Sequence, residues 1–155
     1  MQPKRLISAL ALVLFAACAG AGGAGAGDSS VDIEIVGIVP ESCSIAVDND
    51  RAVIDLSSSV RQVRIATVTE NCNRAAGYTV TVRSSQNGVL SSAQGGAIGY
   101  SVTYGGQDVD LSQGVALERS ESESNQPRDL LVSVPGGDRP GGVYRDVITI
   151  EISAQ

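Results

Sequence analysis

The stretch that decides the fold is Gly142-Val143-Tyr144-Arg145-Asp146-Val147-Ile148-Thr149-Ile150-Glu151-Ile152-Ser153. Large apolar side chains share one parity and polar residues take most of the other; the apolar set is Tyr144, Ile148, Ile150 and Ile152. Because successive side chains of a strand point to opposite faces, this alternation predicts a β-strand with one strongly apolar face. Only Ala154 and Gln155 follow, so we expect no partner strand from downstream.

The same alternation appears near the other end of the chain, in Val31-Asp32-Ile33-Glu34-Ile35. Val31, Ile33 and Ile35 would lie on one face of a strand, with the two acids on the other. A domain that ends on an apolar strand and begins with a spare one leaves a question open. Its last edge is filled either by the chain itself or by a neighbouring molecule.

Residues 1–26 have the pattern of a secretory signal peptide followed by a cleavage region rich in glycine and alanine. The apolar run from Leu6 to Ala17 is too short for a transmembrane helix, which needs about 20 residues. We therefore expect an exported protein in which residues 27–155 form a single domain. An alternative use of the leader is lipid attachment at Cys18, which follows small residues.

The expected exported domain is acidic. Removing Lys4 and Arg5 with the leader takes the 11 basic residues to 9, against 17 acidic ones, for a net charge of −8. With one Phe and no Trp, the chain has neither the basic patch nor the stacking rings that nucleic-acid binding needs. It has no histidine, which removes Ser-His-Asp and Cys-His catalysis. We expect no enzyme, no cofactor, no nucleic-acid partner and no small-molecule substrate.

Cys43 and Cys72 are the two cysteines beyond the leader. An even pair in an exported chain is most simply a disulfide, and each cysteine lies beside an alternating run. We therefore predict one bond that joins neighbouring strands. Closing this loop is worth about 3–4 kcal/mol on the chain-entropy estimate.

The rest of the domain is a series of short alternating runs broken by turn residues, without the apolar period of a helix. This spacing predicts an all-β sandwich. The other expected strands are Val31–Val39, Ser42–Val47, Ala52–Leu56, Val63–Thr69, Tyr78–Arg83, Ile98–Tyr104 and Leu130–Val134. Parity within the runs predicts a core of Ile45, Val63, Ile65, Tyr78, Val80, Val82, Val102, Ile148, Ile150 and Ile152.

Three other features are interpreted as structural. Residues 118–127 include no apolar side chain, so we expect a solvated, mobile loop there. Asp48-Asn49-Asp50 resembles the start of a calcium loop, but Ala52 and Val53 stand where that pattern needs a polar ligand and a glycine. We therefore predict a turn and no metal site. The four tyrosines lie in phase with apolar neighbours, which favours packing in the core over a sugar-binding face.

In their order and spacing, four segments of the chain resemble the pilins of archaic chaperone–usher systems, the spore coat protein U-like family. The segments are Val31-Asp32-Ile33-Glu34-Ile35 shortly before Cys43-Ser44-Ile45, Val68-Thr69-Glu70-Asn71-Cys72, Gly77-Tyr78-Thr79-Val80-Thr81-Val82, and the terminal stretch from Gly142 to Ile150. The resemblance spans nearly the whole domain after the leader.

The resemblance implies an incomplete immunoglobulin-like sandwich that lacks its final strand. A segment near residues 29–39 of one subunit would supply that strand to the next, as a donor strand. The donor side chains would be Val31, Ile33 and Ile35, and the acceptor groove would be formed by Tyr144, Ile148, Ile150 and Ile152. An exposed apolar edge is an aggregation hazard, and a complementary strand relieves it through ladder hydrogen bonds and side-chain pockets.

The implied function is that of a structural subunit of a surface pilus, because a head-to-tail interface that does not close builds a fibre. The implied partners are neighbouring pilin subunits, a periplasmic chaperone and an outer-membrane usher. The protein would pass through the periplasm and end in a pilus at the cell surface.

The alternative is a self-contained β-sandwich binding module, secreted or lipid-anchored, whose N-terminal strand pairs within its own chain. The linker distinguishes the two hypotheses. Val36 to Ser42, with Pro40 inside, leaves few residues for the strand to fold back across the sandwich, and this favours the subunit.

Overall fold

The computed structural model describes residues 29–154. The expected signal peptide and Cys18 lie outside the described residues, so export and lipidation stay predictions. The chain divides into two units, Met1–Gly37 and Ile38–Gln155. The described part of the first unit forms no helix or strand.

The second unit is all-β, as the alternating runs predict, and the described residues include no helix, so none that could cross a membrane. Its strands are β1 (Cys43–Val47), β2 (Val60–Cys72), β3 (Tyr78–Ser84), β4 (Val89–Ser92), β5 (Ala97–Gly99), β6 (Ser101–Tyr104), β7 (Gln107–Val109), β8 (Val115–Arg119), β9 (Glu123–Val134), β10 (Tyr144–Arg145) and β11 (Ile148–Ala154).

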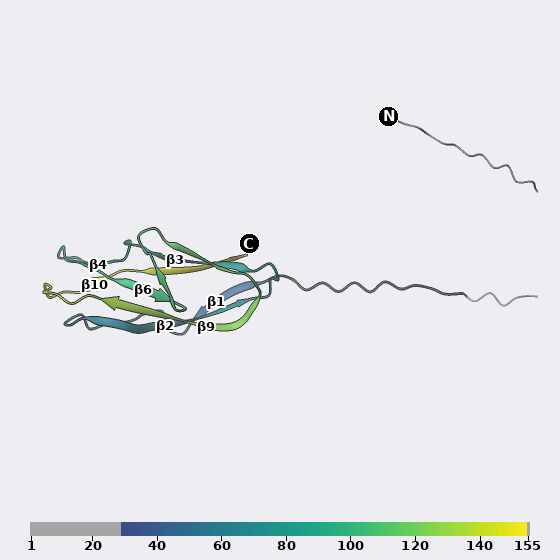
Figure 1. The fold of residues 1–155 in the computed structure, drawn as a ribbon, viewed down its shortest axis with the longest axis horizontal. Coiled ribbons are helices and arrows are strands. Elements are labelled where there is room, and N and C mark those ends of the chain that lie inside the picture. Colours follow the sequence, from purple (N-terminus) through teal and green to yellow (C-terminus); the bar gives the residue numbers. More distant parts are fainter. Residues whose placement is uncertain (1–28, 155) are drawn as a thin grey trace, which may run out of the picture. The chain divides into compact units, whose positions relative to one another are not determined.

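The strands form antiparallel sheets of a β-sandwich. One sheet has the order β1-β2-β9-β6-β7, a second has β11-β3-β8, and a small third sheet has β10-β4-β5. The long strands β2 and β9 run side by side along the length of the domain (Figure 1). Among the described residues, β1 pairs only with β2 and β11 pairs only with β3. Each of the two larger sheets therefore ends in an open strand edge.

The core follows the predicted parity in most strands. Tyr78, Val80, Val82 and Val102 are buried, and the predicted isoleucines pack against this core while remaining half-buried. Tyr104 is also fully buried. The tyrosines thus pack in the core or at its edge, as predicted.

The assignment of Val63 to the core is wrong. Its side chain is 44% exposed, and the buried parity of β2 is that of Ala66, Val68, Glu70 and Cys72. The register of β2 against β9 shifts between Val60 and Val63 and again between Arg64 and Ala66. Each β-bulge adds a residue to one strand and re-aims the side chains that follow it, so parity counted through a bulge assigns the wrong face.

Five segments differ from the expected elements. Val31–Val39 is not a strand, because no strand of the described residues pairs with it. Two predicted strands are each divided between sheets: Ile98–Tyr104 forms β5 and β6, and the terminal stretch Gly142–Ser153 forms β10 and β11. The predicted strand Ala52–Leu56 is not a strand, because no other strand lies beside it to complete a ladder.

The predicted loop at residues 118–127 is mostly strand: β8 extends to Arg119 and β9 begins at Glu123. Its polar residues fit a sheet because Arg119 and Glu123 form charge-assisted hydrogen bonds with residues of other strands.

The predicted disulfide between Cys43 and Cys72 is present. The two cysteines lie directly opposite each other in neighbouring strands, at the start of β1 and the end of β2. Asn73 continues this junction: its side chain accepts a hydrogen bond from the backbone N–H of Ser42 at 2.8 Å and donates one to the carbonyl of Pro40 at 2.9 Å. Where the chain enters the sandwich, its first strand is therefore covalently linked to the neighbouring strand β2.

A buried carboxylate connects several strands at the heart of the domain. Glu70 of β2 is fully buried, and Arg119 of β8 donates to it from Nε at 3.0 Å and from Nη2 at 3.1 Å. The hydroxyls of Tyr78 and Tyr104 donate to it at 2.8 and 2.7 Å. Arg128 of β9 lies 3.8 Å away. The charge is paired and its oxygens are satisfied, which is the condition for burying a carboxylate.

Candidate functional site

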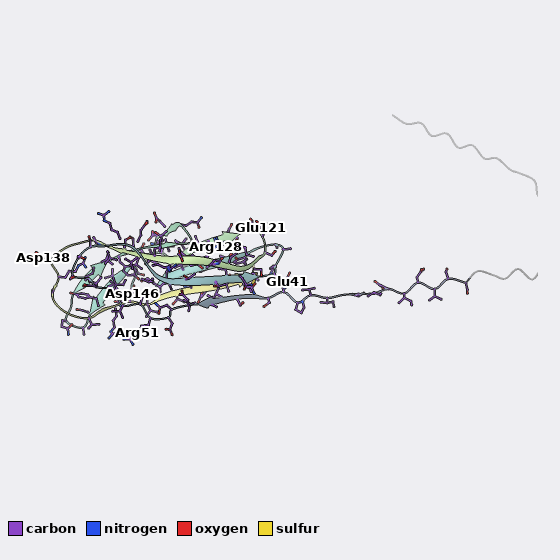
Figure 2. The ribbon with its side chains drawn as sticks, turned by 90° about the horizontal axis from the view of Figure 1, so that it is seen from below. Glu41, Arg51, Glu121, Arg128, Asp138 and Asp146 are labelled. Carbon is purple, nitrogen blue, oxygen red and sulfur yellow. A yellow bond between two sulfur atoms is a disulfide. The ribbon has the colours of Figure 1, made fainter. Side chains whose placement is uncertain are left out.

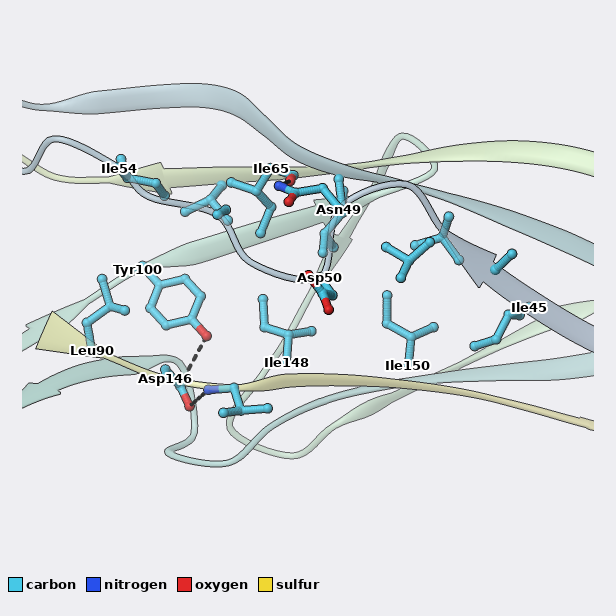
Figure 3. A pocket seen from close by; sticks show the side chains of 18 residues that line it. Ile45, Asn49, Asp50, Ile54, Ile65, Leu90, Tyr100, Asp146, Ile148 and Ile150 are labelled. Carbon is cyan, nitrogen blue, oxygen red and sulfur yellow. Dashed lines mark hydrogen bonds between the residues drawn. The ribbon is translucent and has the colours of Figure 1, made fainter.

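An apolar groove lies between the open edges of β1 and β11. Its volume is about 410 Å³, and one wall comes from β11 while the other comes from β1 and the chain that follows it. Figure 3 shows Ile148 and Ile150 along β11, with Ile45 and Ile54 across from them. The side chains that line the groove are those of Ile45, Ala46, Val47, Asn49, Asp50, Ala52, Ile54, Ile65, Ala66, Val68, Leu90, Tyr100, Leu130, Val132, Asp146, Val147, Ile148 and Ile150.

The walls carry unused hydrogen-bonding capacity as well as apolar surface. A strand that pairs on one side only leaves alternate N–H and C=O groups pointing away from its partner. In the described sheets, β1 and β11 are both in this state, and both border the groove. The groove therefore offers backbone ladders on its rims and apolar contacts on its floor, which is what an added strand requires.

One charged group of the groove, Asp146, is held in place by side chains of the domain itself. Asp146 accepts hydrogen bonds from Ser84 at 2.6 Å, from Ser85 at 2.7 Å and from the Tyr100 hydroxyl at 2.7 Å. Burial alone would raise the pKa of Asp146, but these donors and the N–H of Val147 hold it below its ordinary value. Asp146 is thus a fixed anion at the break between β10 and β11.

The groove continues into a wider hollow at one end. The two spaces share lining residues, among them Ala52, Ile54 and Leu90, and the hollow is completed by residues 137–147. Figure 2 places Asp138 at the opposite end of the domain from Glu41. The apolar floor therefore leads toward an open, more polar mouth at the Asp138 end.

The structure brings two of the four predicted acceptor residues into this groove. Ile148 and Ile150 line it. Ile152 is the next residue of the same face in β11; it is half-buried and packs on the core, but it is not among the lining residues. Tyr144 belongs to β10, where it pairs with β4, and it lines the hollow instead. Its hydroxyl donates to the Pro140 carbonyl at 2.8 Å.

The predicted donor residues are exposed in this chain. Val31, Ile33 and Ile35 are 85%, 82% and 91% exposed, and Ser29–Ser42 includes no strand. A segment with β-branched side chains at alternating positions is thus left without a partner strand among the described residues. Its role as a donor strand stays a prediction.

Several lining residues could not be found from the sequence. Ile54, Leu90 and Tyr100 come from segments far apart in the chain, and only the fold brings them to one floor. The single sequence signal is that each is an apolar residue in or beside a short alternating run. No group of three or more potential metal ligands occurs among the described residues.

Shortening Ile150 tests which face of β11 lines the groove. Ile150→Ala should lower the free energy of unfolding by about 1–2 kcal/mol, less than full burial would give, because the side chain is half-buried in the open groove. Thr149→Ala is the matched control and should change stability by less than about 0.5 kcal/mol, since Thr149 points outward. Chemical denaturation of both variants measures the difference. Equal losses would mean that the two faces of β11 are assigned wrongly.

The residues described above define an all-β domain with an open apolar groove. No family model matches the chain, and no curated protein matches it. Among solved structures, the chain is similar to that of the E. coli Hda pilus minor tip subunit, HdaB, with 20% sequence identity and a TM-score of 0.37. The match covers 71% of this chain and 80% of that chain. A similarity of this size says nothing about the partners or the assembly of the present chain.

Proposed function

We propose that this protein is a structural subunit of a surface pilus that polymerises by donor-strand complementation. The segment near residues 29–39 of one subunit enters the groove between β1 and β11 of the next. Val31, Ile33 and Ile35 provide the inward face, and the open edges of the groove provide the ladder partners. Each subunit then offers its own segment to a further copy, and the chain of contacts grows head to tail without closing.

The observation that carries this proposal is the distribution of exposed apolar side chains. Within the described part of the chain, every exposed large hydrophobic residue except Val63 belongs to one of two sets. One set lies in residues 31–39 and the other lines the groove or its open hollow; the second set is Val47, Val53, Val143 and Val147. The chain thus has two uncovered apolar surfaces, an alternating segment and an open groove, and each is suited to cover the other.

The free energy expected from burying the donor side chains supports a stable interface between subunits. Burying three Val or Ile side chains is worth roughly 1.5–3 kcal/mol each, before the cost of ordering the segment. Backbone hydrogen bonds along two strand edges add to this. The open groove also explains why such a subunit needs a periplasmic chaperone to cover it and an outer-membrane usher to exchange that cover for a donor, which are the partners we propose.

A peptide test examines the proposal directly. A synthetic peptide of residues 29–39 is added to protein that begins at Pro40, and thermal unfolding is followed with and without it. The peptide should bind and raise the melting temperature, since a ligand that binds only the folded state stabilises it. A scrambled peptide of the same composition is the control.

The competing hypothesis, a self-contained binding module, makes the opposite forecast. A sandwich that does not need a donor is equally stable with and without the peptide, and the peptide does not bind. That result would overturn the donor-strand proposal. Size-exclusion chromatography of residues 29–155 expressed alone provides a second test, because a stable monomer favours the self-contained binding module.

A further inference from the structure

The turn between β3 and β4 contains the one Asn-Gly pair of the sequence, Asn87-Gly88. Asn87 is exposed and has a φ of 54°, and Gly88 is buried and has a φ of 78°. Both values lie in the left-handed region, which asparagine and glycine enter more easily than other residues. A Cβ on Gly88 would lie 3.3 Å from the Cβ of Leu111, so a larger residue would be crowded there. The backbone of this turn therefore favours the Asn-Gly pair at a place that water reaches.

Asparagine is among the thermolabile residues of proteins, and it is most reactive when glycine follows, because glycine has no side chain to hinder its own nitrogen. In this reaction the Gly88 nitrogen would lose its proton and form a bond to Cγ of Asn87. The side-chain nitrogen would take up a proton and leave as ammonia. Water then opens the resulting succinimide ring at either of its carbonyl carbons. The net change is hydrolysis of one amide to a carboxylate, and isoaspartate, one of the two products, has an extra atom in the main chain.

The Ser84 hydroxyl holds the nitrogen that would attack. The Gly88 N–H donates to Ser84 Oγ at 2.8 Å, and the Gln86 N–H donates to the same oxygen at 3.1 Å. The hydroxyl proton of Ser84 goes to Asp146 Oδ2 at 2.6 Å. A hydroxyl has one proton to donate and two lone pairs with which to accept, so all the hydrogen-bonding capacity of Ser84 is used. The bond between Gly88 and Ser84 must break before the Gly88 nitrogen can react.

The same turn is connected to two residues that line the groove, Tyr100 and Asp146. The Gly88 carbonyl accepts from the Tyr100 N–H at 2.9 Å. The Tyr100 hydroxyl donates to Asp146 at 2.7 Å, as Figure 3 shows. These three residues and Ser84 therefore form a closed ring of hydrogen bonds. An extra main-chain atom at position 87 would displace Gly88 from its two partners, both of which also bind Asp146.

We propose that Asn87-Gly88 is a deamidation site of the folded domain and that the Ser84 hydroxyl slows the reaction by holding the Gly88 N–H. Ser84 is a positioning residue in this reaction, because it acts through the Gly88 nitrogen. Water is the co-reactant, and no oxidant or reductant takes part. Local opening of the turn, which frees the Gly88 N–H, then sets the rate at which the folded protein is modified.

Peptide mapping by mass spectrometry tests the proposal on residues 29–155, kept folded in a mildly alkaline buffer in which the Gly88 nitrogen loses its proton more easily. Ser84→Ala should raise the deamidation rate of Asn87 about three- to tenfold, as expected when one hydrogen bond of ordinary strength is removed. Ser85→Ala is the matched control, because Ser85 also donates to Asp146, at 2.7 Å, but its oxygen accepts from Val147 and not from Gly88. In concentrated urea, the unmodified protein and both variants should deamidate at one common rate.

The rates are compared at temperatures equally far below the melting temperature of each protein, so that global unfolding contributes equally. Faster deamidation of the folded protein in Ser84→Ala but not in Ser85→Ala supports the proposal. Equal rates in Ser84→Ala and the unmodified protein, or no measurable reaction in either, would overturn it. Equal acceleration in both variants would also overturn it, because the effect would then come from Asp146. A faster rate of Ser84→Ala in urea would do the same, since the folded turn would not be responsible.

Discussion

Replacing Ile33 and Ile35 together with Asp is expected to abolish assembly of residues 29–155 and to leave the sandwich folded. Both side chains are exposed in the unassembled chain, at 82% and 91%, so the domain loses no packing of its own. In the assembled state they would enter a groove floored by isoleucine and leucine, and an unpaired carboxylate there is strongly unfavourable. Sedimentation velocity measures assembly, and thermal unfolding confirms the fold.

The opposite face of the same segment provides the control. Asp32→Asn and Glu34→Gln together remove two charges from the segment but leave its apolar parity unchanged. This pair should assemble as the unmodified protein does, because outward-facing residues of an added strand remain in water. If both double variants assembled normally, residues 31–35 would not be the donor. If both failed to assemble, charge and not the apolar face would control the joint.

The second large effect is expected from Glu70→Gln, which should lower the free energy of unfolding by about 3–5 kcal/mol. The substitution preserves shape but removes the charge that Arg119 faces, and the Arg119 side chain is only 13% exposed. Its guanidinium would then be buried without its counter-ion, and the NH2 group of the amide, in the place of either carboxylate oxygen, would face an N–H of Arg119 with donor against donor. Urea denaturation measures the loss.

A surface ion pair serves as the matched control for Glu70. Glu151 on β11 pairs with Arg83 on β3, and both side chains are about half exposed, 55% and 52%. Glu151→Gln should therefore cost less than about 1 kcal/mol. A comparable loss of stability in the two variants would show that the buried ion pair of Glu70 contributes no more to the free energy of unfolding than an exposed one.

The same carboxylate gives the stability a defined pH dependence. Burial alone would raise the pKa of Glu70, but the hydrogen bonds from Arg119, Tyr104 and Tyr78 hold it below its ordinary value of 4.5. The unfolded chain therefore takes up this proton first. The contribution of Glu70 is fully present above about pH 4.5 and is lost as the pH falls through the lower pKa of the folded state. This part of the acid sensitivity should be missing from Glu70→Gln.

The strands that could be predicted from sequence are those with an uninterrupted alternation. Tyr78–Ser84 appears close to its expected bounds, because it pairs with β11 in simple register. The terminal stretch Gly142–Ser153, expected as one strand, is divided at Asp146 and Val147 into β10 and β11, which pair with β4 and with β3. Parity failed in β2, where bulges between Val60 and Val63 and between Arg64 and Ala66 move the inward face to the other set of residues. A local pattern does not record a bulge, since the extra residue is defined only against the partner strand.

The prediction of a mobile loop at residues 118–127 is wrong because the partners of its charged residues are distant in the chain. Arg119 and Glu123 suggested a solvated loop, yet they lie at the ends of β8 and β9 beside the buried Glu70. One signal was available: Glu70 shares its parity with Val68 and Cys72, so an acid on an apolar face was visible. Its partners were not, because Arg119 is contributed by a strand that pairs with β3 and not with β2.

The candidate groove was predictable on one side only. The alternation of Ile148 and Ile150 indicated an inward face at an open edge, and the structure places both in the groove. The opposite wall depends on how the chain turns after β1, which side chains of Asp48 and Asn49 determine by bonding to β2. These are tertiary contacts between residues far apart in the chain, so a local sequence pattern cannot predict them.

The position of the disulfide has a mechanical consequence. Any pull on residues 29–42 enters the sandwich at Cys43, where the covalent bond to Cys72 passes the load to β2 before the ladder of β1 is strained. β2 is paired along its length with β9, so the tension spreads over many hydrogen bonds that are sheared together. Strand β1 cannot be peeled off from its first residue. A force that pulls on residues 29–42 is therefore passed to β2 through a covalent bond and not through the hydrogen bonds of β1.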